Sequence, residues 1–443
     1  MEDLYTLIKT GSPREIRSHI SETHPVNIAE FVGAIKPGEE QLLITLMAML
    51  SDRQLAEVLE QLEPKEQLRV VDHIPLTRLR SLVQFISPDE LADFLRQLDG
   101  EIVRVLLDVL PDRQTIQELM AYPETSAGGI MTTDFLSFRA QQRCGEVLNF
   151  YRRLAREVEA AYYIYVTDDR GRLVGVASLR DLVLADPEKP LGDIASSAVI
   201  AVTALMDQEE VSNVMRHYDF LALPVIDDNY HLLGVITFDD IIDVIEQEYQ
   251  EDIQRMGGME PTDVPYLHGS VWSVVRRRAL WLAALFGAQM ITGNILNHFQ
   301  GYIEAVVVLA FFIPLLIDTG GNAGAQAASS VIRALALDEI SISRIKYVIW
   351  KEMRTGLILG SMMALIAFFQ ASWLGGSPLI GYTVATALFI IVIMASILGG
   401  ILPLIANRLR VDPAAASAPV VTTIVDGTGL IIYFLVARWI LNL

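Results

Sequence analysis

The hydrophobic positions follow two different patterns along this chain of 443 residues. Up to about residue 270, short apolar groups recur at helical or alternating spacing between charged positions, as in soluble helices and strands. From about Ala279 onward, long apolar runs follow one another, and each is long enough to cross about 30 Å of hydrocarbon as a helix. The pattern therefore predicts a soluble region followed by a membrane domain.

The second half is predicted to form a bundle of five transmembrane helices. Their expected ranges are 278–299, 302–326, 355–374, 382–406 and 415–436. Nearly all Lys and Arg residues of this half precede the first segment or lie in the second and fourth connections. Because positive charge collects on the cytoplasmic side, we expect the amino terminus inside and the carboxyl terminus outside.

The first 124 residues are predicted to be entirely helical. The stretches 28–37 (IAEFVGAIKP), 55–64 (LAEVLEQLEP) and 91–100 (LADFLRQLDG) share their apolar spacing and a closing Pro or Gly. Such a loose repeat is typical of short helices stacked into a small superhelical domain. Asp89 and Asp93 lie one turn apart on one of these helices, where such a pair is usually solvated.

A second repeat follows the helical region. Residues 166–183 (VTDDRGRLVGVASLRDLV) and 225–242 (VIDDNYHLLGVITFDDII) each predict a strand, an acidic turn, another strand and a helix that opens with Ser/Thr-x-x-Asp. This pattern resembles the tandem cystathionine-β-synthase (CBS) domain, a pair of α/β modules, here expected at 125–198 and 199–238. The second module would continue into the linker that follows.

The resemblance to CBS domains implies a candidate nucleotide site. In that family the Ser/Thr-x-x-Asp element can hold a ribose, and the matching pairs here are Ser178 with Asp181 and Thr237 with Asp240. The ligand would be an adenine nucleotide such as ATP. The same residues fit the start of a helix, so helix capping alone also explains them.

Charge separates the two halves of the chain. The chain has 34 basic and 54 acidic residues and a net charge of −20, and the acidic excess lies wholly in the soluble region. Such a region repels phosphate, which argues against a nucleic-acid partner. It suits the concentration of cations, although an acidic surface also serves solubility.

The densest acidic stretch follows the second repeat, in a predicted connecting helix at 239–270. Apolar residues recur there at helical spacing, and no basic residue interrupts the acidic flank before Arg255. Carboxylates about 4 Å apart repel by up to roughly 4 kcal/mol at an effective dielectric near 20, and divalent ions would relieve that repulsion. The candidate ligands are Asp239, Asp240, Asp243, Glu246, Glu248, Glu251 and Asp252.

Asp426 is the most informative residue of the membrane half. It lies near the middle of the last predicted span, where a charged side chain costs on the order of 3 kcal/mol. No basic residue is expected at the same depth, so the carboxylate needs a passing cation or a proton. Asp318, Asn322 and Gln326 share one helix face, expected at the inner end of the second span. Oxygen ligands of this kind suit Mg²⁺ or Ca²⁺.

Two other functions are compatible with these residues. Two intramembrane aspartates, with the sequence DTG at 318–320, invite comparison with an intramembrane aspartyl protease, whose two carboxyl groups share a proton. The DTG match is weak because three common residues recur by chance. A CBS-regulated carrier of another divalent ion or of a small organic cation is the other alternative.

Three motifs and the order of the domains resemble the MgtE family of bacterial Mg²⁺ channels. The motifs are SAGGIMTTDF at 126–135, GGNAGAQ at 320–326 and VDPAAASAPVVTTIVDGTG at 411–429. The resemblance spans nearly the whole chain. It implies a multidomain membrane protein: an all-α domain at 1–124, CBS domains at 125–238, an acidic plug helix at 239–270 and the pore domain at 271–443.

The resemblance to the MgtE family also implies roles for individual residues. Asp426 matches the ion-selecting aspartate, and Asn322 and Gly321 fall in the pore-lining motif. The acidic helix matches a regulatory Mg²⁺-binding stretch, with Asp89 and Asp93 as partners across its interface. The protein would be a homodimer in the bacterial inner membrane, not an enzyme, that takes up Mg²⁺ and closes when intracellular Mg²⁺ binds.

Overall fold

The protein forms two compact units, Met1–Ile245 and Glu246–Leu443, each with its own hydrophobic core. The structure, a computed structural model, describes residues 2–36, 38–154, 160–262, 266, 269–337, 339–416 and 418–443. A few predicted positions lie outside the described residues: Pro37 of the first helical repeat, residues 263–265 and 267–268 of the connecting segment, and Ser417 of the last span.

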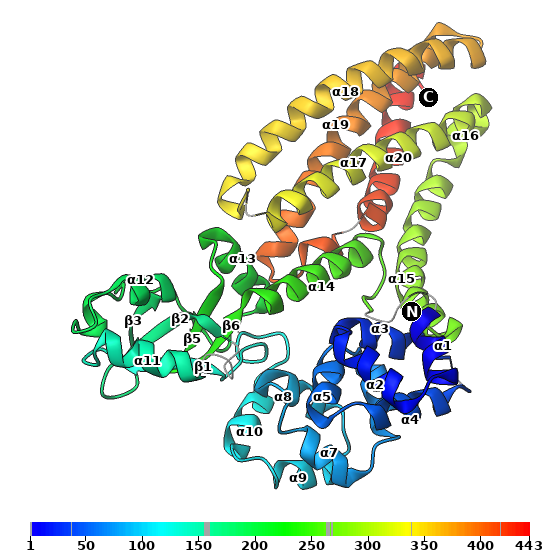
Figure 1. Ribbon diagram of the computed structural model, residues 1–443. Helices are drawn as coiled ribbons and strands as arrows, with labels where there is room; N and C mark the ends of the chain where they lie inside the picture. Colours follow the sequence, from blue (N-terminus) through cyan, green and yellow to red (C-terminus); the bar gives the residue numbers. More distant parts are fainter. Residues whose placement is uncertain are drawn as a thin grey trace. The chain divides into compact units, whose positions relative to one another are not determined.

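The first unit begins with ten short helices, in agreement with the predicted all-helical region (Figure 1). The three predicted repeats fall on α3, α5 and α8, and Pro or a capping Ser marks the start of each of α2, α3, α5, α6 and α8. The helices are α1 (Glu2–Thr10), α2 (Pro13–Glu22), α3 (Pro25–Ala34), α4 (Glu40–Met49), α5 (Asp52–Glu60), α6 (Pro64–Val71), α7 (Leu76–Leu82), α8 (Pro88–Arg96), α9 (Gly100–Leu107) and α10 (Arg113–Ala121).

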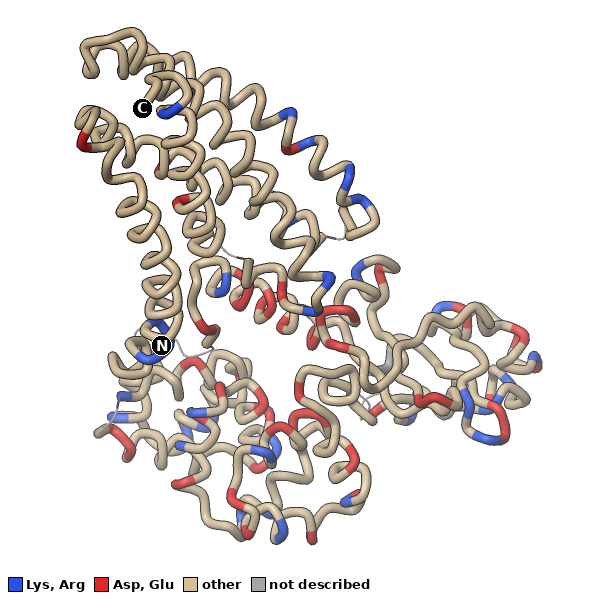
Figure 2. Tube along the Cα trace, turned by 180° about the vertical axis from the view of Figure 1, so that it is seen from behind, with Lys and Arg blue, Asp and Glu red and all other residues tan. Residues whose placement is uncertain are grey.

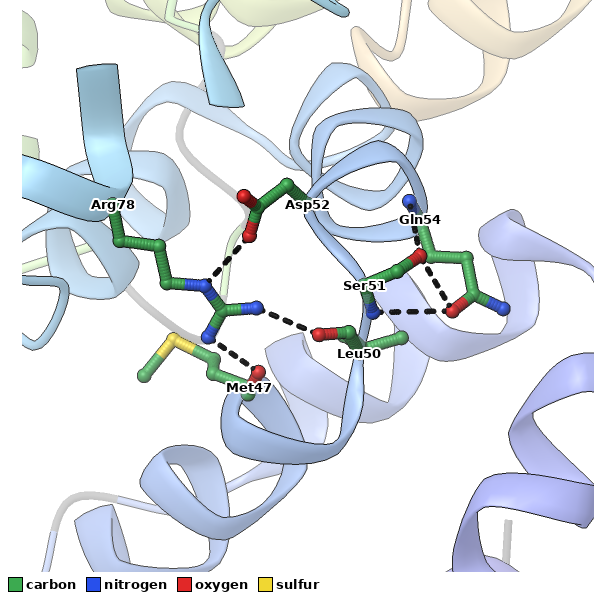
Figure 3. A network of polar contacts seen from close by, with 6 residues as sticks. All are labelled: Met47, Leu50, Ser51, Asp52, Gln54 and Arg78. Carbon is green, nitrogen blue, oxygen red and sulfur yellow. Dashed lines mark hydrogen bonds and ion pairs between the residues drawn. The ribbon is translucent and has the colours of Figure 1, made fainter. Parts of the chain in front are cut away.

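Arg78 of α7 holds the junction between α4 and α5 (Figure 3). Its guanidinium donates to the Asp52 carboxylate at 2.9 Å and to the main-chain carbonyls of Met47 at 2.7 Å and Leu50 at 2.6 Å. Those carbonyls belong to the end of α4, where the helix itself supplies no donors. One side chain therefore satisfies three acceptors on two neighbouring helices.

Replacing Arg78 with alanine is expected to lower the free energy of unfolding of the helical region by about 2–3 kcal/mol, because charged hydrogen bonds to half-buried acceptors are lost. Pulse proteolysis across a urea series measures this change. Arg80→Ala is the matched control, since Arg80 is exposed on the same helix, and its effect is expected within about 0.5 kcal/mol. Equal midpoints for the two variants would contradict the assigned role.

Two small sheets of identical topology follow, as the second repeat predicted. In each sheet the first two strands are parallel and the last two antiparallel, with strand orders β1-β2-β3 and β4-β5-β6. The first module has β1 (Phe135–Arg139), α11 (Cys144–Leu154), β2 (Ala160–Thr167), β3 (Leu173–Ser178), α12 (Leu179–Leu184) and the short helix η1 (Leu191–Asp193). The second has β4 (Val202–Thr203), α13 (Gln208–Tyr218), β5 (Ala222–Ile226), β6 (Leu232–Thr237) and α14 (Phe238–Met256).

The second unit contains five helices long and apolar enough to cross a membrane, as predicted (Figure 1). Charged residues are sparse along them (Figure 2). The elements are α15 (Val271–His298), α16 (Gln300–Ala305), η2 (Val307–Phe312), α17 (Ile313–Ala336), η3 (Ile342–Arg344), α18 (Ile345–Leu374), α19 (Pro378–Arg408), η4 (Pro413–Ala415) and α20 (Ala418–Leu441).

The predicted ends of these helices need correction. The second span is not one helix from residue 302, because the backbone breaks at Val306 and α17 starts only at Ile313, just before Pro314. α18 begins ten residues before the predicted Thr355, and α15 includes all three arginines at 276–278. The hydropathy pattern identifies only the apolar part of each helix, which suits the hydrocarbon of a membrane. Helical turns that contain charged residues extend the helix beyond this apolar part.

α19 lies at the centre of the bundle and packs against α17, α18 and α20. Glycines allow the helices to approach closely: a Cβ atom added to Gly399 would lie 2.1 Å from the carbonyl oxygen of Gly324. α15 packs mainly on α20, and the large apolar side chains of α15 and α18 that remain exposed suit contact with lipid.

Candidate ion-binding and regulatory sites

Asp426 lies eight residues after the start of α20, about 12 Å along a helix of 24 residues. Its side chain is half-buried, and the amide of Gln289 on α15 donates a hydrogen bond to Oδ2 at 3.4 Å. Among the described residues no cationic group pairs with it. Asp318 on α17 is close enough for the two negative charges to repel. The arrangement lacks a positive charge and can accept a cation.

The position predicted for Asp318, Asn322 and Gln326 was wrong. α17 continues for ten residues beyond Gln326, so the three side chains lie in the middle of the span rather than at its inner end. All three are exposed on the isolated chain, and Ser329 and Ser330 extend the exposed polar stripe. We name these five residues the α17 stripe.

Close packing of α17 on α20 sets the register between the two aspartates. Gly321 is buried, and a Cβ atom added there would meet Cγ2 of Thr422 at 3.1 Å. Gly321 thus acts as a packing residue in this structure, and its predicted contact with an ion stays a prediction. Asp318 precedes Gly321 by one helical turn and Asp426 follows Thr422 by one turn. The sequence suggested this pairing only through the comparison with an aspartyl protease, and it did not reveal the contact from Gln289.

A second group of carboxylates surrounds the start of α8 in the first unit. Asp89 is buried, its Oδ1 has no hydrogen-bond partner, and its charge interacts with that of Asp240 on α14. Glu90 adjoins both. Glu60 accepts hydrogen bonds from the main-chain amide and the hydroxyl of Ser87, at 2.8 and 3.1 Å. We name Glu60, Asp89, Glu90 and Asp240 the α8 acidic cluster.

Burial and mutual repulsion disfavour the charged forms of this cluster. Burial is the largest cause in each case, followed for Glu90 by the charges of Asp89, Asp93, Glu60 and Asp240. The pKa of Glu90 is raised to about 8 and that of Asp240 to about 7, and the pKa of Asp89 is also raised. A divalent ion would favour the ionised carboxylates by offsetting this repulsion.

The other predicted regulatory residues are spread out. Asp93 pairs with Arg96 rather than with α14. Asp239, Asp243 and Glu246 are exposed along α14, whereas Glu248, Glu251 and Asp252 are half-buried near its end. No three acidic, histidine or cysteine side chains of the described ranges form a group that could ligate a metal directly. Outer-sphere contacts to hydrated Mg²⁺, which dehydrates reluctantly, fit such spacing.

The end of α14 meets the connection between α19 and α20 in the second unit. Arg255 forms ion pairs with Glu251 of its own helix and with Asp412. Burial, followed by the charges of Asp412 and Glu248, raises the pKa of Asp252 to about 6. Sequence analysis named the acidic residues of α14 here but missed Asp412, which lies far away along the chain.

The two predicted nucleotide-binding pairs have different surroundings. Ser178 and Asp181 cap α12 with a reciprocal pair of hydrogen bonds and also line a cavity of about 210 Å³. Tyr163, Tyr165 and Phe220 lie in its wall. Thr237, in contrast, is buried and donates to Asp240 of the α8 acidic cluster, and neither residue lines this cavity.

Comparison with known families agrees with this division of the chain. The profile described as the MgtE intracellular N domain matches residues 23–125, and the CBS domain profile matches 127–188 and 191–247. The profile described as "Divalent cation transporter" matches residues 313–436, which contain both aspartates of the membrane site. The fold and the site therefore define the class of divalent-cation transporters.

Relatives that match over their full length identify the family within the class of divalent-cation transporters. The chain is 39% identical over 444 residues to "Magnesium transporter MgtE" of Thermus thermophilus, covering 99% of this chain and 98% of the relative. The protein of the same description from Bacillus subtilis is 34% identical, covering 97% and 95%. The chain belongs to the MgtE family. A solved cytosolic domain of the Mg²⁺ channel MgtE in complex with ATP is 38% identical, with a TM-score of 0.51, and covers 54% of this chain and 98% of that domain.

Proposed function

We propose that this chain transports Mg²⁺ across a membrane and that Asp426 holds the ion within the membrane domain. The supporting observation is the Asp426 carboxylate, which lies at mid-helix with an amide donor and a second carboxylate beside it and no cationic partner among the described residues. Such a carboxylate is costly in a membrane unless a cation or a proton neutralises it. The relatives described as magnesium transporters support Mg²⁺ as that cation.

The transporting form is a homodimer in this proposal. The α17 stripe is exposed on the isolated chain, although polar residues at membrane depth avoid lipid. A second copy related by a two-fold axis would enclose the stripe in an aqueous path and bring two Asp426 carboxylates to a shared ion. The basic residues of the second and fourth connections favour a cytoplasmic amino terminus in a bacterial inner membrane.

Uptake by the purified chain in liposomes tests transport. Vesicles that contain a Mg²⁺-sensitive dye are expected to respond to external Mg²⁺, whereas a radiolabelled small organic cation is expected to stay outside the vesicles. Uptake of the organic cation alone would replace our proposal with the carrier alternative. Proteolysis of a transmembrane substrate without ion flux would instead favour the aspartyl protease, although no hydrogen bond joins the carboxyl groups of Asp318 and Asp426 in the described structure.

Intracellular Mg²⁺ acts as the regulator in this proposal. The unpartnered Oδ1 of Asp89 and the crowded charges of the α8 acidic cluster offer oxygen atoms at the junction of the helical region and α14. Mg²⁺ held there, with much of its water shell, would stabilise this junction by differential binding. We infer that low Mg²⁺ leaves the repulsion unscreened and favours the open pore.

Millimolar Mg²⁺ is therefore expected to slow limited proteolysis of the soluble region several-fold, because ordered segments are cleaved less often. The time course is followed on gels for the full chain in detergent. K⁺ at matched ionic strength is the control for charge screening. Identical cleavage in Mg²⁺ and K⁺ would count against regulation at this junction.

The cavity beside Ser178 and Asp181 is our proposed ATP site. Aromatic walls suit a base, and the Asp181 carboxylate can accept hydrogen bonds from ribose hydroxyl groups. The solved relative in complex with ATP supports this ligand. Thr237 and Asp240 are a weaker candidate pair, because Asp240 belongs to the α8 acidic cluster and a phosphate there would meet like charge.

A further inference from the structure

The first turns of α18 carry basic and aromatic residues on one exposed face. These residues are Lys346, Tyr347, Trp350, Lys351 and Arg354, and we name them the α18 basic face. Tyr347 and Trp350 are large apolar rings that are nevertheless 64% and 55% exposed. Figure 2 shows the basic residues gathered at this end of the helix. None of the three cations forms an ion pair with another described residue, so the face is an uncompensated positive surface.

Packing on α19 fixes which side of α18 is turned outward. Val348, Glu352 and Gly356 are buried on the side opposite to the α18 basic face. A Cβ atom added to Gly356 would lie 2.9 Å from Cα of Ile393, and one added to Gly400 would lie 2.8 Å from Cγ of Glu352. Such close contacts prevent rotation of α18 about its axis. Glu352, the acidic residue nearest in the sequence, is therefore held on the buried side, and the α18 basic face stays exposed.

The combination of cations and aromatic rings indicates the chemistry of the partner. Tyr and Trp side chains favour the headgroup level of a membrane, and the long side chains of Lys and Arg extend toward it. The positive-inside bias explains basic residues in this connection, but it does not explain exposed aromatic rings on the same face. Beyond this face the helix exposes apolar side chains such as Ile358 and Met362. A partner with a negative charge joined to an apolar body fits both parts, and an anionic phospholipid has this chemistry.

A groove between α18 and α19 continues from this face toward the middle of the span. Its volume is about 490 Å³, and its lining includes Ser361 and Phe368 of α18 and Phe389 of α19. Ser361 follows Arg354 by two helical turns, about 10 Å, so the two residues share one face. One leaflet of hydrocarbon is about 15 Å thick, so an acyl chain whose headgroup lies at Arg354 reaches the groove. The Ser361 hydroxyl donates to the carbonyl of Leu357 at 2.7 Å and needs no polar ligand there.

We propose that the α18 basic face binds the phosphate headgroup of an anionic phospholipid, with one acyl chain in the groove between α18 and α19. Lys351 and Arg354 are one turn apart on the same face and hold the phosphate between them. Tyr347 and Trp350 flank them at the level of the lipid glycerol. The leaflet is the cytoplasmic one in the orientation proposed above. The site is separate from the ion path and does not depend on which cation is transported.

Native mass spectrometry of the full chain in detergent, with EDTA present to remove Mg²⁺, tests the site. The parent is expected to bind added phosphatidylglycerol more tightly than phosphatidylcholine. Lys351→Gln/Arg354→Gln should weaken phosphatidylglycerol binding at least about tenfold, because each Lys or Arg near an anionic lipid contributes about fivefold. Phosphatidylcholine binding should not change. Because both side chains are exposed, the thermal midpoint of this variant in phosphatidylcholine should equal that of the parent.

Arg276→Gln/Arg278→Gln is the matched control. It also removes two exposed cations, from the start of α15, which packs mainly on α20 rather than on α18. It should weaken phosphatidylglycerol binding by less than about twofold.

Four results would overturn the inference. Parent-like phosphatidylglycerol affinity in Lys351→Gln/Arg354→Gln would remove these two residues from lipid binding. Equal losses in the two paired variants would indicate a general attraction to positive charge rather than a site. Displacement of the lipid by millimolar inorganic phosphate would indicate a site for a free anion. Loss of a dimeric species together with the lipid in Lys351→Gln/Arg354→Gln would assign this face to a contact between two copies of the chain.

Discussion

Asp426→Ala is expected to lower Mg²⁺ uptake into liposomes by at least about hundredfold. The Asp426 carboxylate offers the charge that offsets partial dehydration of the ion, and losing an interaction of about 3 kcal/mol corresponds to roughly a hundredfold change. Asp426→Asn should lose nearly as much, although the asparagine keeps the shape of the side chain and an oxygen that can accept the hydrogen bond from Gln289. The rate is measured from the initial fluorescence change of an enclosed Mg²⁺ indicator.

Glu304→Gln is the matched control for this experiment. Glu304 is an exposed carboxylate of the same membrane domain, paired with Gln300 at 2.7 Å on α16, away from the α17 stripe. Its neutralisation should leave uptake near the parent rate. Parent-like uptake in both Asp426 variants, with normal reconstitution, would remove Asp426 from the ion path and with it our central assignment.

The second large effect is expected from pH at the α8 acidic cluster in Mg²⁺-free solution. The folded-state pKa values of Glu90, about 8, and Asp240, about 7, lie above the unfolded values near 4. Raised carboxyl pKa values stabilise the protonated fold, and this stability is present below pH 4 and lost as pH rises through 7 and 8. The junction of α8 and α14 should weaken by on the order of 3 kcal/mol between pH 5 and pH 8.5.

Hydrogen exchange of peptides from α8 and the first turns of α14, corrected for the intrinsic rate at each pH, measures this weakening. Glu90→Gln should flatten the pH dependence, protect the peptides at pH 8.5 and reduce the additional protection given by Mg²⁺. Glu101→Gln, an exposed change on α9, should behave as the parent. A pH profile unaltered in Glu90→Gln would show that repulsion in the cluster does not govern the junction.

Much of the architecture was predictable because it is local. The repeated strand-turn-strand pattern at 166–183 and 225–242 predicted two sheets of like topology, and five apolar runs predicted five helices. Helix ends were less predictable, since the length of an apolar run in the sequence does not indicate that α18 starts at Ile345 or that α17 starts near Pro314. Those ends depend on charged turns and on a backbone break at Val306 that hydropathy does not register.

The candidate sites were harder to predict from the sequence than the fold, because they depend on tertiary structure. Ser178-x-x-Asp181 and Thr237-x-x-Asp240 are the same motif, yet only the first lines the cavity, whereas the second lies near the carboxylate of Asp89 on α8. Only the comparison with an aspartyl protease suggested that Asp318 lies near Asp426, and the sequence does not show how Gly321 packs against Thr422, on which this proximity depends.

Arg255 gives the far end of α14 a counter-ion that cannot diffuse away. Its guanidinium engages Asp412 and Glu251, so a divalent ion that approaches Asp412 meets a carboxylate already neutralised by the protein. Binding of a divalent ion at Asp412 would therefore exchange one cation for another rather than simply add one. The affinity of Asp412 for a divalent ion would consequently depend on rearrangement of the Arg255 side chain as well as on charge. Its dependence on bulk ionic strength need not match that of an open anionic surface.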